Sequence, residues 1–191
     1  MIKVDLIAHT PEPEKLVATA AKLCYSSSDI DSLRKGLTED KIESFIDMLV
    51  SIGHESVMEH VSFTFGIEGI SRACSHQLVR HRIASYSQKS QRYVNENGFD
   101  FITPPDIEAI PEAKTEFDRI MQEISQSYEK IADILTKKHT AELVSEGLDE
   151  KNAVSKAKKL ACEDARFLLP NACETKIVVT MNVRSLFNYF R

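Results

Sequence analysis

The sequence predicts an α+β fold, in which a mixed or antiparallel sheet is combined with long amphipathic helices. Apolar residues alternate in two short stretches, at residues 2–8 and 61–67, and this period of two indicates strands. Residues 175–183 are rich in β-branched side chains, which indicates a third strand. Other, longer stretches repeat apolar residues every three or four positions, as amphipathic helices do. The two kinds of segment interleave without the regular β-α-β rhythm, which indicates the α+β class.

The first part of the chain begins with a predicted strand over residues 2–8. Residues 12–25 then predict a helix. A clearer helix follows over residues 38–53, where Thr38 is placed as the N-cap and Gly53 as the end.

The middle of the chain contains a predicted half-buried strand over residues 61–67. We expect Ser71 to cap a helix that runs to about Arg82. The stretch "ITPPD" at residues 102–106 then interrupts regular structure, because two consecutive prolines cannot continue a helix or a sheet ladder.

The last part of the chain predicts two long helices, over residues 112–146 and 149–169, with Gly147 between them. The first keeps its apolar residues three or four positions apart over more than five turns. A β-branched strand at 175–183 and a helix from residue 184 onward complete the prediction.

Composition narrows the possible functions. The chain has 191 residues, a net charge of -5 and 42% hydrophobic residues, which fits one globular domain. An acidic balance argues against general nucleic-acid or membrane-surface binding. No apolar run approaches the ~18 residues of a membrane span, and the first residues do not resemble a signal peptide.

The cysteines and glycines add two exclusions. No two of the four cysteines form a CxxC pair, which favours reduced thiols in a cytoplasmic protein. The six glycines never form G-x-G-x-x-G or a phosphate loop. A nucleotide bound by this chain would therefore not be held by a glycine-rich loop.

The stretch "RHRIASYSQKSQRY", residues 80–93, is the most unusual feature of an acidic chain. The nearest acids in sequence are Glu68 and Glu96, so we expect no local carboxylate to neutralise the cluster. Basic residues at a helix C-terminus are favoured by the helix dipole, which is the simplest explanation. Arginine forks surrounded by hydroxyl and amide donors nevertheless favour an anion site over a solvated face. The basic residues of the cluster are Arg80, His81, Arg82, Lys89 and Arg92.

Three other groups of residues are candidates for chemistry or binding. In "GHESVMEH" the histidines His54 and His60 are six positions apart, whereas a zincin helix needs H-E-x-x-H, so we expect no metal. No base adjoins Cys173 in the sequence, which favours an inert buried thiol over a nucleophile. In "NVRSLFN", Arg184 and Asn188 share one helical face, and Asn182 precedes them as a possible N-cap.

Three separated motifs together resemble the flavin-dependent thymidylate synthase family. The family signature RHRxxS…SxR is present as Arg80-His81-Arg82, Ser85, Ser90 and Arg92. The upstream histidine element resembles "GHESVMEH", and the late ARxxLP…NxRSL pattern resembles "ARFLLP…NVRSL". The resemblance extends from the first strand to the last residue, over residues 1–191 as one domain.

The resemblance implies two binding sites and two residues with a catalytic role, Arg80 and Ser90. For Ser90 an anchoring role is favoured over that of a nucleophile. The implied FAD-binding residues are His54, Ser56, Arg80, His81, Arg82, Gln88, Asn182, Arg184 and Asn188. The implied dUMP-binding residues are Gln77, Arg80, Gln88, Lys89, Ser90, Gln91, Arg92 and Arg166.

The reaction implied by the resemblance is reductive methylation of dUMP to dTMP. Methylenetetrahydrofolate gives the carbon, NADPH reduces the flavin and reduced FAD supplies hydride. No cysteine nucleophile is required. The family builds each site from several subunits of a homotetramer, without nucleic acid or membrane as partners.

Two departures from the family pattern are visible. Many members have Asn-Glu where this chain has Ser87-Gln88. The family also continues beyond Arg191 with an arginine that binds the uracil ring, so the C-terminal end of the family domain is expected to lie outside this chain. The alternative functions are a non-catalytic nucleotide- or RNA-binding module that uses residues 80–93 and, more remotely, a metal-dependent hydrolase centred on His54–His60.

Overall fold

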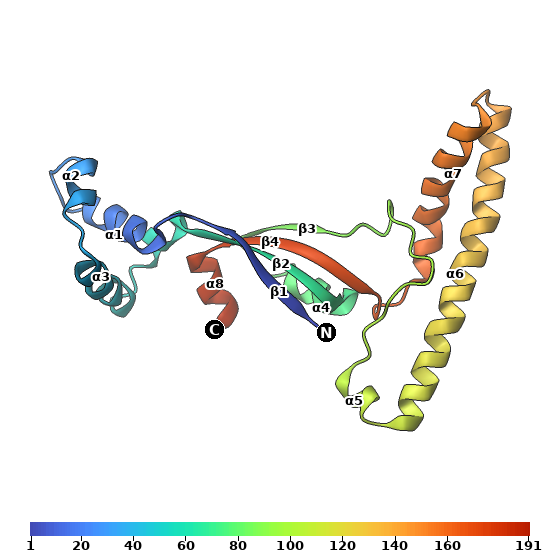
Figure 1. The fold of residues 1–191 in the computed structure, drawn as a ribbon, viewed down its shortest axis with the longest axis horizontal. Helices are drawn as coiled ribbons and strands as arrows, with labels where there is room; N and C mark the ends of the chain where they lie inside the picture. Colours follow the sequence, from blue (N-terminus) through green and yellow to red (C-terminus); the bar gives the residue numbers. More distant parts are fainter. The chain divides into compact units, whose positions relative to one another are not determined.

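A computed structural model describes all 191 residues and confirms the α+β class (Figure 1). Four strands form one antiparallel sheet in the order β1-β2-β4-β3. Each strand coincides with a stretch in which apolar or β-branched residues recur, except β3, which the sequence did not predict. The strands are β1 (Lys3–His9), β2 (Ser62–Ser71), β3 (Ala84–Gln88) and β4 (Glu174–Asn182).

The chain divides into two compact units, and β2, β3 and β4 each contribute residues to both. The hairpin unit contains residues 1–2, 68–76 and 88–176. The terminal unit contains residues 3–67, 77–87 and 177–191.

The terminal unit contains four helices and a 3-10 turn, and two of the helices supply buried residues to a small apolar core together with the turn. Val17, Leu49 and Val61 are among the buried residues of this core. The sequence did not predict helix α2, although Asp29 caps it by accepting the Ser32 N–H at 2.9 Å. The helices are α1 (Pro13–Leu23), α2 (Ile30–Lys35), α3 (Glu39–Ser51), η1 (Glu55–His60) and α8 (Val183–Phe190).

The hairpin unit is dominated by two long helices that pack side by side (Figure 1). Small residues along α7 are buried against α6, with Ala153 and Ala157 fully inaccessible to solvent. The short residues let the two backbones approach closely. The helical elements are α4 (Arg72–Leu78), which ends in the terminal unit, α5 (Pro105–Glu108), α6 (Pro111–Ser145), α7 (Glu150–Ala165) and η2 (Arg166–Leu168).

Several predicted boundaries are confirmed by their capping bonds. The Ser71 hydroxyl accepts the Cys74 N–H at 3.1 Å, and Asn182 accepts the Ser185 N–H at 2.8 Å. Gly53 has a φ of +71° and follows the end of α3, as expected of a C-terminal glycine. Thr38 occupies the N-cap position of α3 but makes no side-chain capping bond.

Two expectations were wrong. The helix that begins after Ser71 ends at Leu78, so residues 80–82 lie beyond it in a turn. The Tyr86 hydroxyl lies 2.9 Å from the Leu78 carbonyl oxygen, which could otherwise accept a further helical bond. Strand β2 also lacks the expected alternation between a buried and an exposed face, because residues 62–67 are all partly exposed. None of the helices is long and apolar enough to cross a membrane.

Candidate functional site

The segment Arg80–Arg82 belongs to the terminal unit and is exposed. Neither Arg80 nor Arg82 forms an ion pair with a carboxylate of this chain. The backbone turns here through bonds from the Arg80 N–H to Gln77 and from the His81 N–H to Leu78, both at 3.1 Å. Two exposed guanidinium groups without a counter-ion are suited to binding an anion from outside the chain.

Tyr86 anchors this segment from strand β3. Its hydroxyl proton is shared between the carbonyl oxygens of Leu78 at 2.9 Å and His81 at 2.8 Å. Burial raises the pKa of Tyr86, while the nearby charge of Arg82 partly opposes that rise. The His81 ring also contacts the Tyr189 ring edge-on, with centroids 4.7 Å apart, so α8 supports the same segment.

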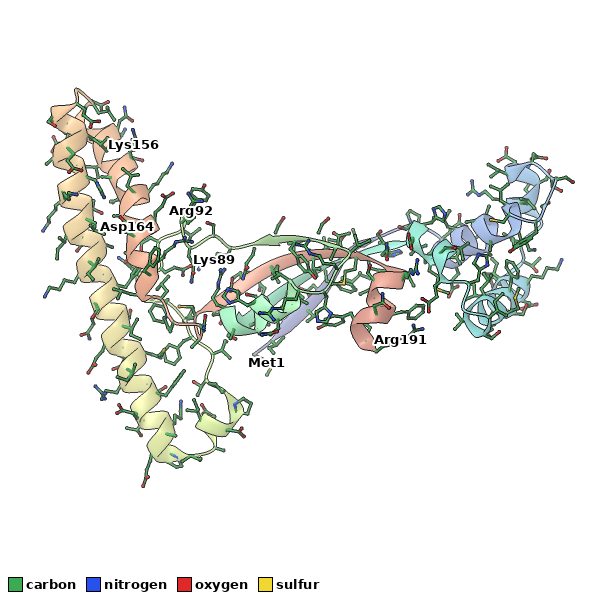
Figure 2. All side chains as sticks on the ribbon, turned by 180° about the vertical axis from the view of Figure 1, so that it is seen from behind. Met1, Lys89, Arg92, Lys156, Asp164 and Arg191 are labelled. Atoms are coloured by element: carbon green, nitrogen blue, oxygen red, sulfur yellow. The ribbon has the colours of Figure 1, made fainter.

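The turn η1 and helix α8 are joined by ion pairs within the terminal unit. Arg184 pairs with Glu59 and lies 3.8 Å from a Glu55 oxygen. Arg191 pairs with Glu55 at 2.8 Å, and Figure 2 shows it at the end of α8. Arg184 is therefore held beside η1 by Glu55 and Glu59, which are not among the predicted flavin residues.

The other predicted flavin residues of this unit differ in solvent exposure and in the hydrogen-bonding groups that they could offer a ligand. His54 is half-buried and donates its backbone N–H to Leu49 at 2.9 Å, whereas Ser56 is exposed. The amide oxygen of Asn182 accepts the capping bond of α8, and the amide N–H groups of Asn182 stay available for a ligand. Asn188 is exposed on α8.

The second part of the basic cluster belongs to the hairpin unit, and there the expectation that no local carboxylate neutralises it was wrong. Lys89 pairs with the buried Glu96 at 2.8 Å. Arg92 pairs with Glu163 of α7, also at 2.8 Å. Figure 2 shows Lys89 and Arg92 beside the part of α7 that carries Asp164. Both cations are already compensated by this chain.

Gln88 and Ser90 each form side-chain hydrogen bonds within the hairpin unit. The Gln88 amide donates to the hydroxyl of Ser75 at 2.7 Å and to that of Thr175 at 3.2 Å. The Ser90 hydroxyl oxygen accepts the Arg92 N–H at 3.2 Å. The Ser90 hydroxyl keeps its own proton free to be donated to an anion.

The remaining predicted substrate residues fall in both units. Arg166 donates through Nε to the Glu163 carbonyl at 3.3 Å, so Glu163 contacts Arg166 as well as Arg92. Gln91 is partly exposed in the hairpin unit, and Gln77 is exposed in the terminal unit.

The alternatives weighed for metal and thiol chemistry gain no structural support. Nowhere in the 191 residues do three or more His, Cys, Asp or Glu side chains form a group able to hold a metal ion. Glu55 and Glu59 instead pair with arginines of this chain. Burial raises the pKa of Cys173 to about 12, with the charge of Glu96 adding to the effect, so its thiol stays protonated at neutral pH.

Sequence reasoning missed the side chains that compensate or anchor the predicted residues. Glu96 lies only seven residues after Lys89, so its nearness in sequence is a local signal for this pair. Glu163 is 71 residues from Arg92 and Glu59 is 125 residues from Arg184, and no local pattern signals such pairs. No local pattern singles out Tyr86, which anchors the Arg80–Arg82 segment.

Comparison with known proteins assigns the family. Residues 5–191 match the family described as thymidylate synthase complementing protein. The chain is 52% identical over 190 residues to the flavin-dependent thymidylate synthase of Clostridium tetani, covering 100% of this chain and 73% of the relative. It is 48% identical over 191 residues to the flavin-dependent thymidylate synthase of Geobacter sulfurreducens, covering 99% and 72%.

A solved structure supports the fold. The UMP/dUMP methylase PolB from Streptomyces cacaoi, bound with 5-Br dUMP, superposes with a TM-score of 0.59 at 21% identity. The match covers 99% of this chain and 76% of that one, and at this identity it bears on the fold alone. From the family match and the two relatives we conclude that the chain belongs to the flavin-dependent thymidylate synthase family.

Proposed function

We propose that this protein reductively methylates dUMP to dTMP, with methylenetetrahydrofolate as carbon donor and NADPH as reductant of the flavin. The observation that carries the proposal is the exposed, uncompensated pair Arg80 and Arg82 in a chain 52% identical to a flavin-dependent thymidylate synthase. The name thymidylate synthase, carried by relatives that are 52% and 48% identical, supports a pyrimidine nucleotide as substrate.

The chemistry of the donors in the terminal unit fits a flavin dinucleotide. A pyrophosphate needs positive charge and N–H donors, and Arg80 and Arg82 offer both without losing an ion pair. We propose that FAD is held by these residues with His81, His54 and Ser56 and by the α8 group. That α8 group is Asn182, Arg184 and Asn188, while Gln88 is the one proposed FAD contact that lies in the hairpin unit.

The proposed dUMP residues lie mainly in the hairpin unit. Ser90, Gln91 and Arg92 supply a hydroxyl, an amide and a guanidinium within three consecutive residues, and Arg166 adds a second guanidinium. These groups match the oxygens of a phosphate monoester. The complete proposed set is Gln77, Arg80, Gln88, Lys89, Ser90, Gln91, Arg92 and Arg166.

In this proposal the chain supplies position and charge. When bound, the reduced flavin supplies the hydride that completes the methyl group. Arg80 acts as a catalytic residue because its permanently charged guanidinium touches cofactor or substrate and stabilises negative charge there. Ser90 anchors the nucleotide through its free hydroxyl proton, and Cys173 takes no part because its thiol is buried and protonated.

We further propose that residues 1–191 act as one flavin-dependent thymidylate synthase domain that assembles into a homotetramer with shared sites. Proposed FAD contacts are spread over His54–Ser56, Arg80–Arg82 and Asn182–Asn188, and the chain has no dinucleotide-binding glycine loop. If subunits share the cofactor, FAD stabilises the tetramer by mass action. Sedimentation on dilution, with and without FAD, tests this; monomers that hold FAD as tightly as the oligomer would exclude shared sites.

The alternative RNA-binding function is disfavoured by the pairing of the basic cluster. A backbone-binding surface needs several cations free to contact successive phosphates. Here Lys89 and Arg92 are neutralised by Glu96 and Glu163, so the cluster is not one continuous basic surface.

One experiment tests the proposed function directly. The purified protein is expected to show flavin absorbance, to bind dUMP, and to form dTMP when methylenetetrahydrofolate and NADPH are supplied. A colourless protein that neither takes up added FAD nor binds dUMP would contradict the proposal. RNA binding by that same protein would instead favour the alternative.

A further inference from the structure

A short loop of the hairpin unit, residues 89–96, carries four of the residues proposed to bind dUMP. Glu96 closes this loop, because its carboxylate accepts a hydrogen bond from Lys89 Nζ at 2.8 Å. Only 6% of the Glu96 side chain is exposed, compared with 31% for Lys89. A carboxylate so deeply buried is strongly destabilising without its partner, so the pair holds the two ends of the loop together.

Backbone hydrogen bonds attach both ends of the loop to rigid elements. The Lys89 N–H donates to the Lys176 carbonyl of β4 at 3.0 Å. The Glu96 N–H donates to the hydroxyl of Tyr128 at 3.3 Å, and Tyr128 is fully buried on α6. One end is thus fixed to the sheet and the other to the helical hairpin.

Inside the loop, the chain is ordered around Ser90. The Ser90 carbonyl accepts the Val94 N–H at 3.2 Å, and the Ser90 hydroxyl accepts the Arg92 N–H at 3.2 Å. The direction of the Ser90 hydroxyl and the start of the Arg92 side chain therefore depend on where the loop ends are held.

We propose that Glu96 is a positioning residue for the dUMP phosphate, which it serves through Lys89 and Tyr128 without touching the nucleotide. This inference rests on the proposed function. It also refines the role of Lys89, because one of its three N–H donors is used by Glu96 and its charge is compensated. Lys89 then contributes to dUMP binding chiefly by fixing residues 90–92.

The principal test is Glu96→Gln, which keeps the size of the side chain but removes its charge. The amide can still accept one bond from Lys89, but the charge-assisted contact is lost, and such contacts are roughly twice as strong as neutral ones. We expect dUMP to bind about tenfold more weakly, while FAD affinity stays within about twofold. The matched control is Glu116→Gln, which breaks an exposed pair with Arg119 on α6 and should change neither affinity.

Two further variants keep the test decisive if Glu96→Gln does not fold. Tyr128→Phe removes the acceptor of the Glu96 N–H and should weaken dUMP binding by a few-fold. The double change Lys89→Met with Glu96→Leu replaces the buried charges by apolar groups of similar volume, which preserves folding in comparable cases. That protein should bind FAD normally and dUMP poorly.

Amide hydrogen exchange gives a readout that needs no ligand. In Glu96→Gln, the amides of Arg92 and Val94 should exchange faster than in the unaltered protein, whereas those of α7 should not. A folded Glu96→Gln protein with unchanged dUMP affinity, beside an unaltered protein that binds dUMP, would overturn this inference alone. Failure of the unaltered protein to bind dUMP would overturn the proposed function and this inference with it.

Discussion

Residues 80–82 and 89–92 belong to one basic run in the sequence, yet only the second group forms ion pairs with carboxylates of this chain. Arg80 and Arg82 are exposed and have no carboxylate partner. Lys89 and Arg92 are each paired with a carboxylate at 2.8 Å. An unpaired arginine can bind an anionic ligand without first breaking an ion pair. A paired cation must first leave its carboxylate, or else it serves to stabilise the loop at residues 89–96.

The two regions are nevertheless anchored by the same device, a tyrosine hydroxyl. Tyr86 donates to the carbonyl oxygens that flank Arg80, and Tyr128 accepts the N–H of Glu96. Tyr86 is partly buried, whereas Tyr128 is fully buried, and burial raises the pKa of Tyr128 to about 12. The uncompensated region is thus held near the surface, and the compensated region is held from the core.

The largest effect is expected from Arg80→Ala. Because Arg80 has no partner in the chain, its removal should leave stability within about 0.5 kcal/mol. It should weaken FAD binding by about 10- to 100-fold, the loss of one well-placed charge-assisted contact. Titration followed by flavin absorbance measures the affinity, and Lys41→Ala, another exposed cation of the terminal unit, is the control. Unchanged FAD affinity would mean that uncompensated charge does not mark the site.

A smaller effect, of about tenfold, is expected on dUMP binding from Arg92→Ala or Arg166→Ala. The phosphate must compete with Glu163 for Arg92, which lowers the net contribution of this arginine. FAD affinity should change much less. Calorimetric titration with both ligands measures the difference, and Arg119→Ala, which also loses carboxylate partners, is the control. Equal losses for the two ligands would remove the assignment to dUMP.

Tyr86→Phe should weaken FAD binding by about three- to tenfold, the range of one hydrogen bond between neutral groups. The change removes the shared proton that anchors the Leu78 and His81 carbonyls but leaves both arginines in place. Tyr25→Phe is a suitable control because Tyr25 is 83% exposed. A folded Tyr86→Phe protein with full FAD affinity would show that the anchor is dispensable.

The smallest effect is expected on the free energy of unfolding at alkaline pH, through the buried thiol of Cys173 in the hairpin unit. The pKa of Cys173 is raised from 9.0 to about 12, so the folded state holds the thiol proton more tightly than the unfolded state. This stabilisation is fully present below pH 9 and is lost as the pH rises toward 12, by at most about 1.4 kcal/mol per pH unit. Cys173→Ala should flatten the decline in unfolding free energy between pH 9 and 10, whereas the exposed Cys24→Ala should not. Denaturant melts at both pH values decide this.

The longer helices, three of the four strands and the order of the motifs followed from the sequence alone. Apolar periodicity located α6 and β2, because burial of one face imposes a period that can be read locally. β-Branched residues located β4. Capping by Ser71 and Asn182 was also foreseen, since a cap bonds only three residues ahead. The FAD and dUMP residues were selected from motifs, and their roles stay predictions.

Tertiary structure alone decided which members of the basic run are free. Arg92 finds its partner 71 residues away and Arg184 finds one 125 residues away, and sequence spacing carries no information about such meetings. The early end of α4 has the same origin, because β3 must turn back to pair with β4, and this brings the Tyr86 hydroxyl onto the last helical carbonyl. Periodicity reports local burial, whereas the charge state of a surface depends on which distant segments the fold places beside it.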